Sequence, residues 1–168
     1  MFIKKTLLAA ALLSIGAVGV ASAASNPATT TFKVKLTVQK ACSVTATDLD
    51  FGSQDATATN FSAASNGTVT VTCSKTTPYV VGLAPSNGNA AGAGAMAGQT
   101  SGNTDTVAYQ LYSNSGLTTV WGNSGASNGV SGTGTGSAAT ALPVYGKVAS
   151  ANVTPDSYLD TVTVNVTY

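Results

Sequence analysis

The sequence ends on TVTVNVTY, residues 161–168. Four apolar side chains alternate there with threonine and asparagine: Val162, Val164, Val166 and Tyr168. A period of two places such side chains on one face of a β-strand and the polar ones on the other. A second run of this kind is TFKVKLTVQ, residues 31–39, whose apolar face consists of Phe32, Val34, Leu36 and Val38. The two runs predict two half-buried strands near opposite ends of the chain.

Further segments between these runs alternate in the same way or are short and apolar. We predict them as strands over residues 68–73, 79–83, 106–113 and 141–148. Two long connections, residues 84–105 and 122–140, consist mostly of Gly, Ala, Ser, Thr and Asn and are predicted as loops. No helical period of useful length follows residue 23. The sequence therefore predicts one all-β domain, an antiparallel sandwich with one hydrophobic face per sheet.

The strand count suggests that this sandwich lacks one strand. An immunoglobulin-like sandwich ordinarily has seven strands and ends on one that pairs beside its sixth. If residues 161–168 form the sixth strand, an apolar groove remains beside it, because the sequence stops at Tyr168. Residues 31–39 of a neighbouring molecule have the pattern to fill that groove. The alternative is that residues 31–39 pair within their own domain as an ordinary first strand.

The composition excludes much chemistry. The chain has 168 residues, with 7 Lys, 6 Asp and no Arg, Glu or His. Without histidine there is no imidazole base, no Ser-His-Asp triad and no His-ligated zinc site. The formal net charge of +1 provides no basic surface for nucleic acid. We therefore expect no catalytic residue, no metal, no cofactor, and neither a nucleic acid nor a small-molecule substrate as partner.

Residues 1–23 have the features of a secretory signal peptide. Lys4 and Lys5 form a basic start, residues 7–20 are apolar, and Ala21-Ser22-Ala23 supplies small residues for cleavage. We therefore expect export from the cytoplasm. The two cysteines, Cys42 and Cys73, are predicted to form a structural disulfide, because exported chains meet an oxidising environment.

Several short motifs, taken in order, are similar to those of a known family. They are Cys42 followed by Phe51-Gly52, Val71-Thr72-Cys73, Tyr109-Gln110-Leu111-Tyr112, Trp121-Gly122, Val144-Tyr145-Gly146 and the ending from Tyr158 to Tyr168. The chain thereby resembles the spore coat protein U domain, the fold of archaic (Csu-type) chaperone–usher pilins of Gram-negative bacteria.

This resemblance implies an incomplete immunoglobulin-like antiparallel β-sandwich that is completed by a donor strand. A periplasmic chaperone would first lend a strand, and an outer-membrane usher would exchange it for the N-terminal segment of another pilin subunit. The implied organisation is a signal peptide (1–23), a donor segment (24–39) and a pilin domain (40–168). Phe32, Val34, Leu36 and Val38 would then be donor residues, and Val162, Val164, Val166 and Tyr168 would line the acceptor groove. The implied function is a subunit of a surface pilus or fimbria that supports adhesion and biofilm formation.

Other functions are compatible with parts of the sequence. A glycosidase would need a carboxylate pair such as Asp48 with Asp50 or Asp156 with Asp160, but aspartate between strands is typical of turns. A secreted carbohydrate-binding module would use exposed aromatic platforms, for which the candidates are Tyr112, Trp121 and Tyr145. The family resemblance also permits a structural protein of a spore or cell coat.

Overall fold

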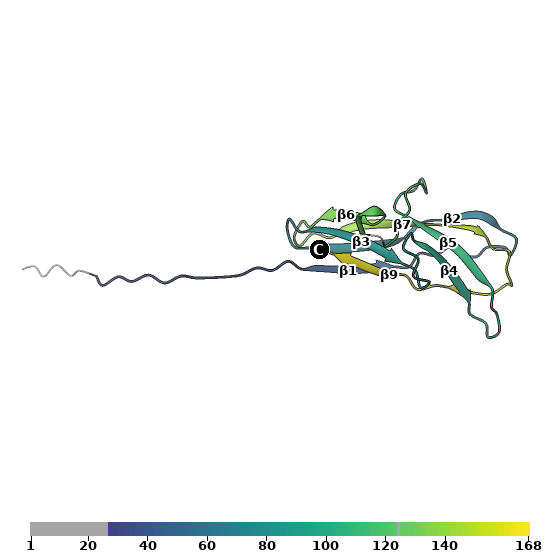
Figure 1. Ribbon diagram of the computed structural model, residues 1–168, viewed down its shortest axis with the longest axis horizontal. Helices are drawn as coiled ribbons and strands as arrows, with labels where there is room; N and C mark the ends of the chain where they lie inside the picture. The colour runs from purple at the N-terminus through teal and green to yellow at the C-terminus, as the bar shows by residue number, and fades with distance from the viewer. Residues whose placement is uncertain (1–26, 124) are drawn as a thin grey trace, which may run out of the picture. The chain divides into compact units, whose positions relative to one another are not determined.

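The structure is a computed structural model that describes residues 27–123 and 125–168 (Figure 1). The predicted signal peptide, residues 1–23, lies outside the described residues. The chain divides into two units, residues 1–37 and residues 38–168. The described part of the first unit, residues 27–37, contains neither helix nor strand. The second unit contains every strand that the structure assigns.

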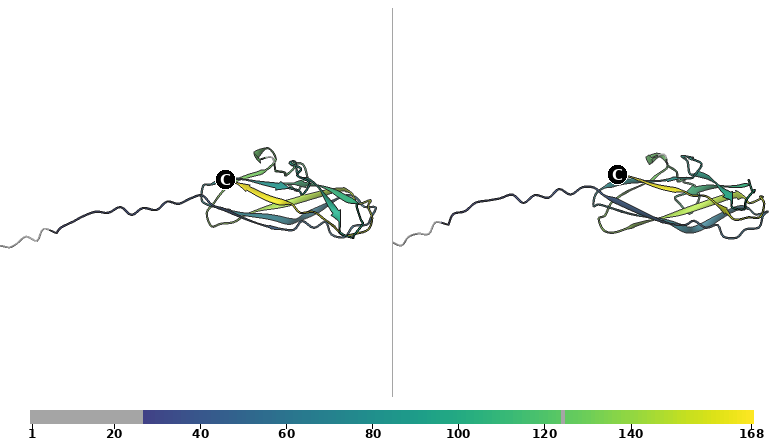
Figure 2. Two further views of the ribbon diagram at one scale, coloured as in Figure 1. Left: turned by 60° about the horizontal axis from the view of Figure 1, so that its bottom comes forward. Right: turned by 90° about the horizontal axis from the view of Figure 1, so that it is seen from below.

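The second unit is an all-β fold of two antiparallel sheets (Figure 2). The larger sheet has six strands, which in spatial order are β1 (Cys42–Thr47), β2 (Thr59–Cys73), β7 (Thr140–Ser150), β5 (Thr106–Tyr112), β4 (Ala93–Gly98) and β8 (Tyr158–Leu159). The smaller sheet has three strands, in the order β6 (Val130–Thr133), β3 (Pro78–Ala84) and β9 (Thr163–Thr167). A single 3₁₀ turn, η1 (Gly125–Ser127), precedes β6. The predicted fold class, an antiparallel all-β sandwich, is therefore confirmed.

The core lies between the two sheets and consists of the inward-facing residues of the alternating strands. Its buried members include Val69 and Val71 of β2, Val81 and Leu83 of β3, and Val107, Tyr109 and Leu111 of β5. Trp121 is fully buried, and its indole N–H donates to the carbonyl of Val81 at 2.9 Å. Trp121 is thus a core residue, and the sugar-stacking role considered for it is wrong because its ring has no exposed face.

The two connections predicted as loops each contain a strand. Residues 84–105 contain β4 and residues 122–140 contain β6, whose sequences AGAMAG and VSGT include few of the residues that favour strands. Pairing with the neighbouring strand β5 determines β4. A Cβ on Gly94 would lie 2.1 Å from the ring of Tyr109, so any residue other than glycine would clash with that ring. Ladder hydrogen bonds and a close-packed ring outweigh local propensity here.

Residues 31–39 differ from the prediction in the opposite way. Their alternation is that of a strand, yet they form none in the structure. Phe32, Val34 and Leu36 are each 86% exposed, and Val38 is 81% exposed. An apolar face of this kind needs a sheet edge and a core to cover it, and within the described residues neither sheet takes a strand from this segment.

The predicted disulfide is present and joins β1 to β2. Cys42 and Cys73 are directly opposite in the β1–β2 ladder, with their Cα atoms 4.1 Å apart. Next to the bridge, the Ser74 amide donates to the Ala41 carbonyl at 2.8 Å, and the Ala41 amide donates to the Ser74 hydroxyl at 2.9 Å. Because β1 pairs with β2 alone, these links hold an edge strand in place.

Replacing both cysteines by alanine should lower the free energy of unfolding by about 3 kcal/mol, since the unfolded chain regains the freedom of a loop of about 30 residues. Urea unfolding of the oxidised protein and the variant measures this difference. The reduced wild-type protein is the control and should unfold near the variant. Equal urea midpoints for the oxidised protein and the variant would contradict the prediction.

Candidate functional site

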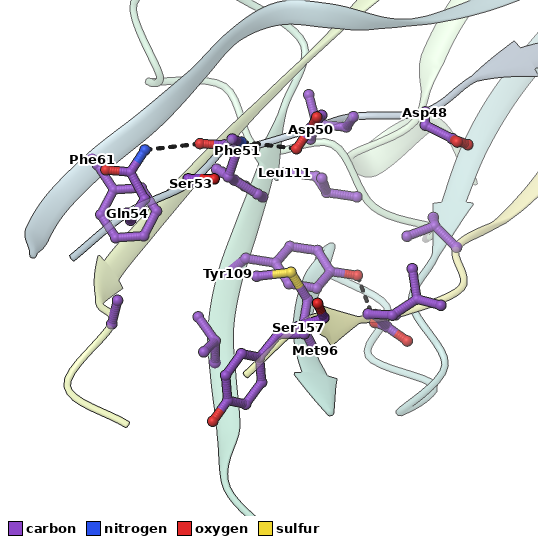
Figure 3. Close-up of a pocket in the computed structure, with 18 of the residues that line it drawn as sticks. Asp48, Asp50, Phe51, Ser53, Gln54, Phe61, Met96, Tyr109, Leu111 and Ser157 are labelled. Atoms are coloured by element: carbon purple, nitrogen blue, oxygen red, sulfur yellow. Dashed lines mark hydrogen bonds between the residues drawn. The ribbon is translucent and has the colours of Figure 1, made fainter. Parts of the chain in front are cut away.

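The sandwich is open along one side, between the edges of its two sheets. β1 pairs only with β2 and β9 pairs only with β3, so each has one edge without a ladder partner among the described strands. Between these edges lies a cleft of about 990 Å³, which we call the edge cleft (Figure 3). Its rims are residues 46–56, which follow β1 toward β2, and residues 151–162, which lead from β7 toward β9.

The floor of the edge cleft is the hydrophobic core itself. The core side chains that line it are Val69, Leu83, Val107, Tyr109, Leu111 and Val144. They come from β2, β3, β5 and β7, where the alternation of each strand turns every second side chain inward. Figure 3 shows Tyr109 and Met96 on the side of the cleft opposite Asp50, Phe51 and Ser53. The cleft is therefore apolar at its base and polar along its rims.

The rim formed by residues 46–56 was missed in the sequence reasoning. Leu49 and Phe51 are half-buried and pack against the core, and the ring of Phe51 meets that of Phe61 edge to face at 6.0 Å. The Asp50 carboxylate accepts from the Gly52 amide at 2.8 Å, and Gly52 has a φ of 67°. The signal was present in the sequence as Asp-Phe-Gly, a turn-forming pair around one apolar residue.

The four predicted groove residues lie along one edge but do not all line the cleft. Val162 and Val164 are among its lining residues. Val166 is half-buried on the same face of β9, while Tyr168 is 54% exposed beyond the end of that strand. The four predicted donor residues, in the segment before Lys40, are the most exposed large apolar side chains among the described residues.

A hydrogen bond joins the floor of the cleft to its rim. The Tyr109 hydroxyl donates to the Asp160 carboxylate at 2.6 Å (Figure 3). Burial, together with this bond and the nearby negative charge, raises the pKa of Tyr109. Burial also acts to raise the pKa of Asp160, but hydrogen bonds from Ser86, Tyr109 and Thr161 outweigh it and lower the pKa. Asp160 is therefore an ionised carboxylate in the connection between β8 and β9, three residues before β9 begins.

The other aspartate near this rim is also held by loop donors. Asp156 accepts from the Asn103 side chain at 2.7 Å and from the amide and hydroxyl of Thr100 at 2.9 and 2.8 Å. The hydrogen bond from the Asn103 side chain, followed by those from Thr100, lowers the pKa of the Asp156 carboxyl. The sequence-based interpretation of Asp156 as a turn residue agrees with these contacts, because its carboxylate ties two loops together.

Within residues 27–123 and 125–168, no group of three or more cysteine, aspartate or other metal-binding side chains is placed to hold a metal ion. No described helix has the length and apolar character needed to cross a membrane.

The two antiparallel sheets, with an open side between unpaired edges, form an immunoglobulin-like sandwich. The sequence pattern of the Spore Coat Protein U domain family matches residues 28–165. The chain belongs to this family.

Among solved structures, the chain is similar to one described as the CsuC-CsuE chaperone-tip adhesion subunit pre-assembly complex from archaic chaperone-usher Csu pili of Acinetobacter baumannii. The sequence identity is 25% and the TM-score is 0.52. The match covers 79% of this chain and 40% of the other, so this chain spans well under half of its neighbour's length. No curated protein sequence matches this chain.

Removing the Tyr109 hydroxyl should weaken the floor-to-rim link. We expect Tyr109→Phe to lower the free energy of unfolding at pH 7 by about 1–3 kcal/mol, the usual cost of losing a hydrogen bond to a charged group. Tyr112→Phe is the matched control, because Tyr112 lies on the opposite face of β5.

The loss in the free energy of unfolding caused by Tyr109→Phe should also depend on pH. The pKa of Asp160 is lower in the folded chain than its ordinary value of 3.8, so its stabilising effect is present above that value and is lost as pH falls through the folded pKa. The difference between wild type and Tyr109→Phe should therefore shrink below about pH 4. Urea unfolding at pH 7 and pH 3 measures it, and a difference that grows in acid would be the contrary result.

Proposed function

We propose that this chain is a non-enzymatic structural subunit of a cell-surface pilus, built by donation of residues 31–39 of one copy to the edge cleft of the next. One observation carries the proposal. A single chain contains both an apolar cleft between two unpaired strand edges and an exposed segment with the pattern that such a cleft requires. Strand addition joins exactly these two features in other peptide-recognition systems.

The donor and acceptor patterns match in length. Phe32 to Val38 spans six residue steps and presents four apolar side chains, as does Val162 to Tyr168. At the rise of an extended strand, each row is about 20 Å long. A donated segment would therefore run along the whole of β9 with every second side chain directed at the core.

Burial of the donor side chains supplies the driving force for assembly. Each is almost fully exposed in the described chain, and its transfer out of water is worth about 1.5–3 kcal/mol. Main-chain hydrogen bonds to the unpaired edge of β9 replace the bonds to water that the donated backbone loses. The outward side chains of the segment, Lys33, Lys35 and Thr37, stay in solvent.

The similar complex from Acinetobacter baumannii indicates the partners of this pathway. That complex joins a chaperone to a tip adhesion subunit before assembly of a chaperone–usher pilus. For this chain we infer export to the periplasm, transient cover of the edge cleft by a chaperone strand, and transfer by an outer-membrane usher to another pilin subunit. A chaperone is needed because the unpaired strand edges and the exposed apolar donor segment would otherwise aggregate. Adhesion and biofilm formation are the roles that we infer for the assembled fibre.

A charge on the donor face should block assembly. Leu36→Asp places an unpaired carboxylate in the apolar cleft, which costs several kcal/mol, so we expect long polymers of the exported protein to be lost. Thr37→Asp is the matched control, because the same new charge on the outward face of the segment stays in water. Light scattering and electron microscopy of purified surface material measure the outcome. Normal polymers from Leu36→Asp would overturn the proposed function.

A further inference from the structure

Two charged residues extend the apolar rows of donor and acceptor. Lys40 lies two residues after Val38, and Asp160 lies two residues before Val162. Each therefore continues the even-numbered, core-facing series of its own segment by one position. Among the described residues, Lys40 is exposed and Asp160 is partly buried, with its carboxylate bonded to the floor residue Tyr109.

The domain's topology determines which end of β9 receives which end of a donor. The donor segment leaves its own domain at Ala41, beside Ser74 and the disulfide. β9 finishes at this same end, because Thr167 pairs with Val80 near the start of β3. Figures 1 and 2 agree, since the C-terminus lies where β1 begins. The start of β9, with Asp160, is therefore at the opposite end of the domain.

Head-to-tail growth then requires one strand direction. We call the end of the domain at which its donor segment leaves the exit end. If a donor ran parallel to β9, the exit end of its own domain would lie against the exit end of the receiving domain. The donor segment of the receiving domain leaves from that same place, so no room would remain for it to reach a third copy. If it runs antiparallel to β9, the exit end of one domain meets the far end of the next, and the step repeats without limit. In that direction the C-terminal end of the donor, at Lys40, reaches the start of β9.

Within this antiparallel arrangement, we propose that a single register is used, in which Lys40 of the incoming copy pairs with Asp160 of the receiving copy. This inference rests on the proposed function and names the residues that give it direction and register. In this register the apolar pairs across the junction are Phe32 with Tyr168, Val34 with Val166, Leu36 with Val164 and Val38 with Val162.

The charge pair is needed because the apolar pattern alone does not define a register. A slip of two residues keeps every apolar side chain on the core face. A slip in one direction puts Val38 against the Asp160 carboxylate, and a slip in the other puts Lys40 against Val162. Either slip places a charged side chain against an apolar one instead of against the opposite charge, which is unfavourable. The lowered pKa of Asp160 means that its charge is present at neutral pH.

The outward-facing residues allow a direct test of direction and register in the full chain. Thr163 of β9 is exposed and stands opposite Thr37 in the proposed register. Thr37→Cys with Thr163→Cys should cross-link neighbouring copies in assembled fibres under oxidation, because directly opposite Cβ atoms are about 5 Å apart. Lys33→Cys with Thr163→Cys is the matched control, because those positions are opposite only in a parallel arrangement. Peptide mapping by mass spectrometry distinguishes the new bridge from Cys42–Cys73.

A charge-reversal series tests the pair itself. Lys40→Glu should slow polymer growth about fivefold at low ionic strength, and the deficit should shrink with added salt. Lys33→Glu changes the charge of the same exposed segment opposite the neutral Thr167, and should stay within about twofold of wild type. The double variant Lys40→Glu with Asp160→Lys should recover most of the rate. Lys40 is exposed outside every strand, so the Lys40→Glu result stands even if Asp160→Lys fails to fold.

The outcomes separate this inference from the proposed function. The Thr37–Thr163 cross-link together with slowed growth of Lys40→Glu supports the register. Fibres that form through residues 31–39 but link Lys33 to Thr163, or that grow equally fast with Lys40→Glu, overturn the register and leave the proposed function standing. A wild-type protein that never joins copies through residues 31–39 overturns both.

Discussion

The whole structure depends on two strand edges that have no partner. β1 and β9 are edge strands of the two sheets, and a cleft lined by core side chains lies beside them. Backbone donors and acceptors along such edges, and apolar side chains beneath them, are both unfavourable when left to water. Under the proposed function, one extended segment with one apolar face from another copy covers these edges.

The rest of the domain holds this open side in shape. The disulfide and the bonds between Ala41 and Ser74 tie the edge strand β1 to its neighbour, which has a partner on each side. Within the cleft, the hydrogen bond from Tyr109 to Asp160 links the floor to the segment that leads into β9. A cleft held in shape by such links can receive a strand with little reorganisation, which reduces the cost of binding.

The strands rich in valine and aromatic residues were predictable, whereas the others were not. β5, the second half of β2 and β9 follow from period-two alternation, because one face of each is buried. β4 and β6 lie in segments that the sequence predicts as loops, because AGAMAG contains no strand-favouring residue and VSGT is too short to show alternation. They become strands because a neighbouring edge pairs with them, and Gly94 leaves room for the Tyr109 ring. Pairing of this kind is a long-range effect that local propensity does not contain.

The sequence alone was enough to define an exported all-β chain with a disulfide and an apolar strand pattern at each end. It did so through the two-residue alternation of apolar and polar side chains, the composition and the cysteine pair. These features are local, because alternation and residue chemistry are properties of neighbouring positions. The tertiary structure alone decided that β1 and β9 are both edges, that a cleft lined by core side chains lies beside them, and that the Asp160 carboxylate accepts a hydrogen bond from Tyr109. Which strands become neighbours depends on contacts between segments far apart in the chain, and those contacts have no signature in any single run of residues.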